Sequence, residues 1–342
     1  MNKKDYSYYL PGKNLALKPA VPRDSSKLFV YDTQKDKIIL DKFFDLDKYI
    51  PKESFLVLND TKVLPARITM TKESGGKVVV LLLVNEIDGN IVPALVDRKI
   101  NVGEFLNFST GEVLRIKNQE ENIFNLEFKF DRQKLFSILE KSGTMPIPPY
   151  LKKTSLSRDE LVRKYQTIFA HNKGSSAAPT ASLHFTDNVF ARLKSKGIEK
   201  YFVTLHVGLG TFAPLSDENL EKKKLHKEYY EVDETTLRLI EASKSRGRKL
   251  ISVGTTVTRT LESWAYTGLQ KDKTDLFIYP PHDFKMVDGL LTNFHLPESS
   301  LMMLVEAFLQ YKGAKKTLVE LYKTAIDNDF RFYSFGDAML IV

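Results

Sequence analysis

The chain has 342 residues, of which 42% are hydrophobic and 27% charged, a composition typical of a globular protein with a substantial core. It contains no cysteine, which excludes thiol catalysis and disulfides, and no apolar run approaches the roughly 18 residues of a membrane helix. Lysine and arginine exceed aspartate and glutamate by 51 − 43 = 8, a balance that permits a nucleic-acid partner without requiring one.

The first half of the chain has mainly a β pattern. Short apolar runs bounded by polar turns predict strands at 28–31 and 55–58. From about 66 to 130 further runs alternate with Gly, Asn and Asp turns, a spacing typical of a small barrel or sandwich. A helix is predicted at 131–141. We therefore expect a small β-barrel domain over residues 66–149, inserted into a larger domain.

The second half alternates strands with helices. Three prolines in Met145–Tyr150 cannot lie inside a helix or a central strand, so we place a domain boundary there. The later periodicity favours an α/β domain formed by residues 1–65 plus 150–342. Its predicted elements are helices at 187–196, 234–246 and 298–312, and strands at 201–207 and 250–253.

One predicted turn has the character of an anion site. The strand at 250–253 runs into Gly254, Thr255 and Thr256 and then into a helix. Such a start offers free backbone N–H groups and the positive end of the helix dipole to a phosphate or carboxylate. An ordinary threonine cap explains the segment as well, and for this segment alone we favour it.

The segment TLHVGLGTF (204–212) contains a second candidate. On a strand, His206 shares a face with Phe202 and Thr204, and Gly208 and Gly210 allow close approach of backbone to a ligand. A lone histidine in such a place is more often a core residue.

The segment LHKEYYEV (225–232) contains a third candidate. If the chain is extended, His226, Glu228 and Tyr230 point to one side and place a base, an acid and a phenol in a row. An edge strand with solvated polar residues is an equally good explanation. No pair of histidines has metal-ligand spacing, so we expect no metal.

These segments, in this order, resemble the S-adenosylmethionine:tRNA ribosyltransferase-isomerases of queuosine biosynthesis. The similarity includes LVLNDTKVLPAR, AAPTASLHFT and VTLHVGLGTF. A single block is weak, but a dozen collinear blocks are specific. The blocks are 22–26, 56–67, 75–83, 145–150, 165–167, 177–186, 203–212, 226–232, 253–263, 277–279, 288–297 and 332–341.

The resemblance implies a two-domain α/β (α+β) fold, in which a larger α/β domain with a β-barrel-like core is interrupted by the small barrel. It also implies a reaction, transfer and isomerisation of the ribosyl group of S-adenosylmethionine onto 7-aminomethyl-7-deazaguanine at the tRNA wobble position. The products are epoxyqueuosine, adenine and methionine. We expect S-adenosylmethionine to be consumed as a substrate, with no other cofactor, in a cytoplasmic monomer that has no membrane partner.

The reaction needs at least one general base and one general acid, because a proton leaves the carbon beside the sulfonium and adenine leaves with a proton. We expect catalysis from His206, His184, Glu228, Tyr230 and His226. We expect an anionic group of the substrate to be held by Thr255, Thr256 and Arg259. The other expected substrate-binding residues are Arg23, Asn59, Thr61, Arg67, Gln166, Gly208, Gly210, Thr211, Gly254, Asn293, His295 and Asp337.

Two alternatives remain open. One is an RNA-binding relative without catalytic activity, and the other is an S-adenosylmethionine-dependent enzyme with a different acceptor. The chain departs from the family pattern at Ala213, where the family usually has arginine. That departure concerns substrate preference more than the class of reaction.

Overall fold

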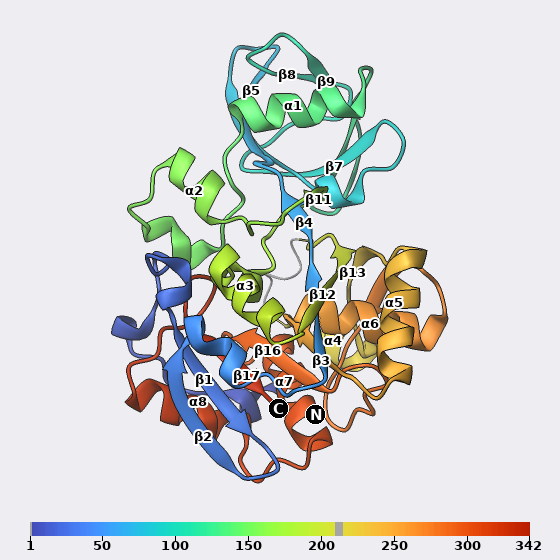
Figure 1. Cartoon of the computed structure of the whole chain (residues 1–342). Coiled ribbons are helices and arrows are strands. Elements are labelled where there is room, and N and C mark those ends of the chain that lie inside the picture. Colours follow the sequence, from blue (N-terminus) through green and yellow to red (C-terminus); the bar gives the residue numbers. More distant parts are fainter. Residues whose placement is uncertain (1, 209–214) are drawn as a thin grey trace.

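The computed structural model describes residues 2–208 and 215–342. Gly210, Thr211 and Ala213 therefore lie outside the described residues. The larger part of the molecule is built on a nine-stranded mixed sheet, below the closed barrel in Figure 1. The strand order in this sheet is β15-β13-β12-β3-β14-β16-β17-β1-β2.

The strands of the large sheet are β1 (Lys27–Asp32), β2 (Lys37–Lys42), β3 (Ser54–Asn59), β12 (Glu199–Leu205), β13 (Lys224–Glu231), β14 (Lys249–Val253), β15 (Lys271–Leu276), β16 (Gly289–Asn293) and β17 (Ala338–Ile341). The helices are α1 (Arg132–Ser142), α2 (Arg158–Lys164), α3 (Asp187–Ser195), α4 (Asp217–Lys222), α5 (Glu234–Ser245), α6 (Thr255–Thr267), α7 (Ser300–Tyr311) and α8 (Leu318–Asp327).

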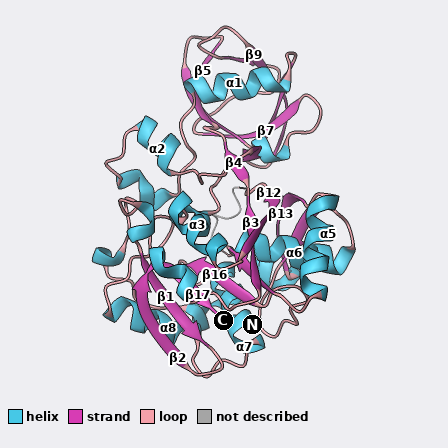
Figure 2. Ribbon diagram, in the orientation of Figure 1, coloured by secondary structure: helices cyan, strands magenta, loops and turns pink. Residues whose placement is uncertain are grey.

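Both faces of the large sheet are covered, because its central strands are apolar on both sides. In β3, Phe55 and Val57 belong to a core shared with α5, α6, α7 and α8. Leu56 and Leu58 alternate with them and belong to a second core, shared with α3. Figure 2 shows helices on both sides of these strands. Parallel pairing of β3 with β12 and with β14 places the carboxyl ends of three strands at one edge.

The second sheet is a closed antiparallel barrel with strand order β10-β7-β6-β5-β8-β9. Helix α1 buries Leu135, Phe136, Ile138 and Leu139 in the core of this barrel. The barrel strands are β5 (Arg67–Lys72), β6 (Lys77–Leu82), β7 (Ile91–Val96), β8 (Phe105–Asn107), β9 (Val113–Glu120) and β10 (Ile123–Phe128). A separate two-stranded sheet, β4 (Thr61–Val63) with β11 (Asn172–Ser175), lies between barrel and large sheet.

The chain enters and leaves the barrel at one point. Arg67 and Thr144 exchange both backbone hydrogen bonds, with N···O distances of 3.2 and 2.7 Å. Gly143 follows α1 so closely against the entering chain that a Cβ atom there would lie 1.8 Å from the carbonyl oxygen of Pro65. The two ends of the barrel are therefore hydrogen-bonded neighbours.

The expected fold class is confirmed, since the protein is a mixed α/β structure with a closed antiparallel barrel and a larger sheet. The division into domains at 66–149 stays a prediction, although all six barrel strands fall within that range. Within the described part of the chain, no helix combines the length and the apolar character needed to cross a bilayer.

Candidate active site

A cavity of about 520 Å³ lies in the larger part of the molecule, where helices α6 and α7 begin. Its wall is formed mainly by residues 148–150, 177–181, 254–256, 292–301 and 333–334. These segments are far apart in the sequence, and the carboxyl ends of β14 and β16 deliver two of them. The volume is within the range of small-molecule sites, about 300–1,000 Å³.

Helix α6 begins at this cavity. Its N-cap is Gly254, which has φ 97° and no side chain to satisfy the first backbone N–H groups. Those N–H groups have no partners within the helix, and Thr255 and Thr256 line the cavity. The sequence suggested either an anion site or a threonine cap here. The cap is a glycine, so the free N–H groups of the helix start are available to a ligand.

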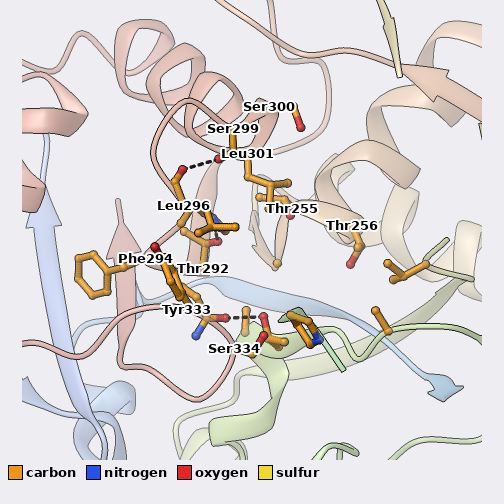
Figure 3. Close-up of a pocket in the computed structure, with 18 of the residues that line it drawn as sticks. Thr255, Thr256, Thr292, Phe294, Leu296, Ser299, Ser300, Leu301, Tyr333 and Ser334 are labelled. Atoms are coloured by element: carbon orange, nitrogen blue, oxygen red, sulfur yellow. Dashed lines mark hydrogen bonds between the residues drawn. The ribbon is translucent and has the colours of Figure 1, made fainter. Parts of the chain in front are cut away.

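Helix α7 also begins at the cavity. Its N-cap Ser299 accepts a hydrogen bond from the backbone N–H of Met302, and Ser300 and Leu301 complete the wall. Figure 3 shows the two helix starts together, with Thr255 and Thr256 from one and Ser299 to Leu301 from the other. Two helix dipoles therefore place positive potential at the same cavity.

An aromatic surface forms another part of the wall. The rings of Tyr150 and Tyr333 lie 4.8 Å apart between centroids, and the Tyr150 hydroxyl donates a hydrogen bond to Ser334. Pro148 and Pro149 extend this surface. A flat heterocyclic base fits such a wall, because aromatic and proline faces stack against it without needing polar partners.

His295 is the only histidine among the described residues that line the cavity. Its Nε2 lies 2.9 Å from the hydroxyl oxygen of Thr292, and its backbone is held by the hydroxyls of Tyr8 and Tyr322. Burial lowers the pKa of His295 to about 3. The imidazole is therefore neutral near pH 7 and serves as a fixed hydrogen-bonding group.

Asn293 lines the cavity and is oriented from behind by His184. Its amide oxygen accepts a hydrogen bond from Thr180 at 2.9 Å, and its amide nitrogen lies 3.2 Å from Nε2 of His184. Nδ1 of His184 lies 2.8 Å from the hydroxyl of Ser26. Burial lowers the pKa of His184 to about 4. Both ring nitrogens have partners and His184 is outside the cavity wall, so its geometry is that of a positioning residue.

His206 lies near the cavity but is not part of its wall. It follows β12, and its Nδ1 lies 2.8 Å from the hydroxyl of Thr61 on β4. Gly174 packs against the ring so closely that an added Cβ would lie 2.8 Å from Nε2. Burial, together with the positive charge of Arg132, lowers the pKa of His206 to about 4.

Glu228 and Arg259, expected as an acid–base group and an anion-binding group, form a buried ion pair with each other. Glu228 also accepts a hydrogen bond from the backbone N–H of Gly208 at 2.9 Å. The guanidinium of Arg259 further donates to the carbonyl oxygens of Leu276 and Thr274. Arg259 is thus engaged inside the protein and does not face the cavity.

The predicted row of His226, Glu228 and Tyr230 is not continuous. The pairing of β13 with β15 shifts register between Lys224 and Glu228, and His226 is exposed whereas Glu228 and Tyr230 are buried. The Tyr230 hydroxyl donates to the carbonyl oxygen of Leu269 at 3.0 Å within the core. The three side chains therefore do not form one catalytic surface.

Three of the other expected residues, Asn59, Gln166 and Arg23, make hydrogen bonds to backbone groups. Asn59 binds both the N–H and the carbonyl of Leu205, and Gln166 does the same for Val63. Arg23 donates to the carbonyl oxygens of Gln166, Arg163 and Lys164.

Two more expected residues also lie off the cavity wall. Asp337 accepts hydrogen bonds from Arg331 and from the backbone of Lys27. Arg67 is exposed at the base of the barrel. Of the expected residues that the structure describes, five lie together at the cavity, namely Gly254, Thr255, Thr256, Asn293 and His295.

The sequence reasoning did not single out Tyr150, Tyr333, Thr180 or Glu298, which also line the cavity. Glu298 has φ 56°, an uncommon conformation for a residue other than glycine or asparagine. A signal for Tyr150 was present, since it closes the proline-rich segment taken as a domain boundary. Within residues 2–208 and 215–342, no group of three or more His, Asp or Glu side chains is arranged to hold a metal ion.

Comparison with known proteins gives consistent results. Residues 3–341 match the family model described as queuosine biosynthesis protein. Proteins named S-adenosylmethionine:tRNA ribosyltransferase-isomerase from Staphylococcus aureus strains JH9 and Newman are 41% identical over 355 residues, covering 100% of this chain and of each relative. A solved structure of S-adenosylmethionine tRNA ribosyltransferase from Thermotoga maritima is similar, with 31% identity, a TM-score of 0.56, and coverage of 99% of this chain and 100% of that one.

Proposed function

The chain belongs to the queuosine biosynthesis protein family, and we infer from this membership that it is an S-adenosylmethionine:tRNA ribosyltransferase-isomerase. It transfers and isomerises the ribosyl group of S-adenosylmethionine onto 7-aminomethyl-7-deazaguanine at the tRNA wobble position. The net charge of +8 fits a polyanionic substrate.

The reaction balances without an oxidant or a reductant. The ribosyl carbons lose their bonds to the adenine nitrogen and to sulfur. One of them gains a bond to the acceptor nitrogen, and the electron pair left by the departing C–H proton forms one new bond within the ribosyl unit, which is the isomerisation. One proton leaves the carbon beside the sulfonium, adenine takes up one proton, and the neutral amine loses one. The products are epoxyqueuosine in tRNA, adenine, methionine and one net proton.

S-adenosylmethionine occupies the cavity at the starts of α6 and α7. The observation that carries this assignment is the combination of a glycine-capped helix start with an aromatic and proline wall in one cavity. The α6 start receives the substrate carboxylate, because exposed backbone N–H groups and the helix dipole favour an anion there. The wall beside Tyr150 and Tyr333 receives the adenine ring.

Substrate contacts come from Thr255, Thr256, Asn293 and His295, which line the cavity. His295 acts as a neutral hydrogen-bonding partner, because burial keeps it unprotonated. His206 and Glu228 stay our candidates for proton transfer. Each is held by a polar contact close to the carboxyl end of β12, which is the edge of the sheet beside the cavity.

We also propose that no metal or other cofactor takes part and that S-adenosylmethionine is consumed. Among the described residues, the wall of the cavity offers hydroxyls, an amide, one carboxylate and one imidazole, and no three His, Asp or Glu side chains are grouped as metal ligands. We propose that the protein acts as a monomer. The expected cytoplasmic location stays a prediction.

The decisive experiment incubates the protein with S-adenosylmethionine and with tRNA that carries the aminomethyl base. Mass spectrometry of the nucleosides is expected to show conversion to epoxyqueuosine, with one adenine released per modified base. Absence of both products would favour an RNA-binding relative without activity. Adenine release that depends on a small amine and not on tRNA would favour the alternative acceptor.

A further inference from the structure

Three exposed lysines lie on two neighbouring segments next to the cavity wall. We call Lys18, Lys152 and Lys153 the lysine edge. Lys152 and Lys153 end the short 3₁₀ helix η6 (Pro149–Lys153). The hydroxyl of Thr154 donates to the carbonyl oxygen of Leu17 at 2.7 Å. This bond places the segment that carries Lys18 beside the segment that carries the other two.

The lysine edge continues directly from the cavity wall. Pro149 and Tyr150, at the start of η6, line the cavity. Successive Cα atoms are about 3.8 Å apart, so the Cα of Lys152 lies within about 7.6 Å of the Cα of Tyr150. The lysine edge therefore lies next to the cavity in which S-adenosylmethionine is proposed to react, where the acceptor base of the tRNA has to arrive.

The charge of the lysine edge is not neutralised by the protein. Some other surface lysines are paired, for example Lys164 with Glu160 and Lys173 with Glu140. Within the part of the chain that the structure describes, no carboxylate lies in ion-pair distance of any of the three lysines. The nearby Arg331 is held by Asp337 and donates to the carbonyl oxygen of Lys18.

We propose that Lys18, Lys152 and Lys153 bind the phosphates of the tRNA nucleotides that flank the modified base. This inference rests on the proposed function and assigns the surface that holds the anticodon strand. Single-stranded nucleic acid is held by cationic side chains along its backbone next to aromatic surfaces for its bases. The lysine edge supplies the cationic side chains for the backbone, next to the cavity where the acceptor base meets S-adenosylmethionine.

The test compares the wild type with the triple variant Lys18→Gln/Lys152→Gln/Lys153→Gln, measuring the Kd for tRNA that carries the aminomethyl base between 0.05 and 0.4 M KCl. Each lost phosphate contact reduces the slope of log K against log salt by about 0.7, so the slope becomes shallower by about 2. If the affinities converge near 1 M, the Kd at 0.1 M salt rises by about 100-fold. The KM for S-adenosylmethionine at saturating tRNA is expected to stay unchanged.

A matched control is the triple variant Lys37→Gln/Lys42→Gln/Lys323→Gln on β2 and α8, which removes the same charge from exposed lysines elsewhere. Equal weakening in both variants would trace the effect to net charge and overturn the lysine edge. An unchanged Kd and slope in the edge variant would overturn it as well. Adenine release by the wild type, measured in parallel, separates either result from a failure of the proposed function.

Discussion

Glu228 on β13 and Arg259 on α6 form an ion pair in which both side chains are almost fully buried, with 4% and 8% of their side-chain surface exposed. The pair joins β13 to α6, the helix whose first residues line the cavity. The guanidinium of Arg259 is therefore bound to protein groups, and it links α6 to β13.

The ion pair predicts strong coupling in unfolding experiments. Arg259→Leu alone removes the cation that neutralises the buried carboxylate of Glu228 and is expected to lower the free energy of unfolding by about 3–5 kcal/mol. The double variant Glu228→Leu/Arg259→Leu is expected to lose much less than the sum of the two single variants. Additive losses in urea unfolding would mean that the two charges do not interact.

Gly254 predicts a loss of substrate binding that can be separated from a loss of stability. Gly254→Ala places a side chain at φ 97°, which costs about 1–3 kcal/mol and shifts the start of α6. The matched control is Gly268→Ala at the other end of the same helix, where φ is 70°. Both variants are expected to lower the Tm, and only Gly254→Ala to raise the KM for S-adenosylmethionine. A raised KM in both would contradict the role of the α6 start.

His206 is predicted to be needed for turnover but not for folding. His206→Ala is expected to abolish adenine release at an unchanged circular dichroism spectrum. Gly174→Ala is also expected to lower kcat, because its new methyl group would press on the imidazole ring of His206. Full activity in His206→Ala would remove this histidine from the mechanism.

Two buried histidines, His184 and His295, and the partly buried His206 lead us to expect that the fold is destabilised by acid. Burial lowers the pKa to about 4 for His184 and His206 and to about 3 for His295. Because the unfolded chain binds protons at these groups from about pH 6.5 downward while the folded protein does not, stability falls as the pH decreases from 6.5 to about 4. Each histidine contributes up to about 1.4 kcal/mol per pH unit.

His295→Gln is the sharpest variant for this effect. The free energy of unfolding of this variant is expected to fall less steeply with decreasing pH than that of the wild type. The difference in slope corresponds to about one fewer proton taken up on unfolding. Urea unfolding at pH 7, 6, 5 and 4 measures the difference. Identical slopes would show that His295 is protonated in the folded protein.

Much of the fold was predictable because its signals are local. The helices near 187–196 and 234–246 and the strands near 55–58 and 250–253 follow from apolar periodicity, and the structure has all four within two residues. The sequence did not predict β2 or β9, because no residue of the edge strand β2 is buried and the second half of β9 is entirely polar. Pairing between distant strands has no local signal at all.

The site was harder to predict, since residue type does not reveal a partner. Glu228 and Arg259 both look like active-site residues in the sequence, and only the structure shows that they bind each other. Thr255 and Thr256 could be identified from the sequence because a strand–glycine–helix segment exposes free backbone N–H groups at the helix start. This exposure does not depend on tertiary contacts. Tyr333 lies in no such pattern and reaches the cavity only through the fold.

The hydrogen-bonded pair of Arg67 and Thr144 has a consequence for how this architecture can change. Because the two residues exchange both backbone bonds, their Cα atoms are about 5.5 Å apart. A short turn could therefore bridge them if everything between were removed, and the register of the nine-stranded sheet would be unaffected. Lengthening the inserted segment costs little folding free energy, about 0.6 kcal/mol for each doubling of a flexible loop. The barrel can thus be enlarged, trimmed or exchanged, by evolution or by a protein engineer, at one point of the chain.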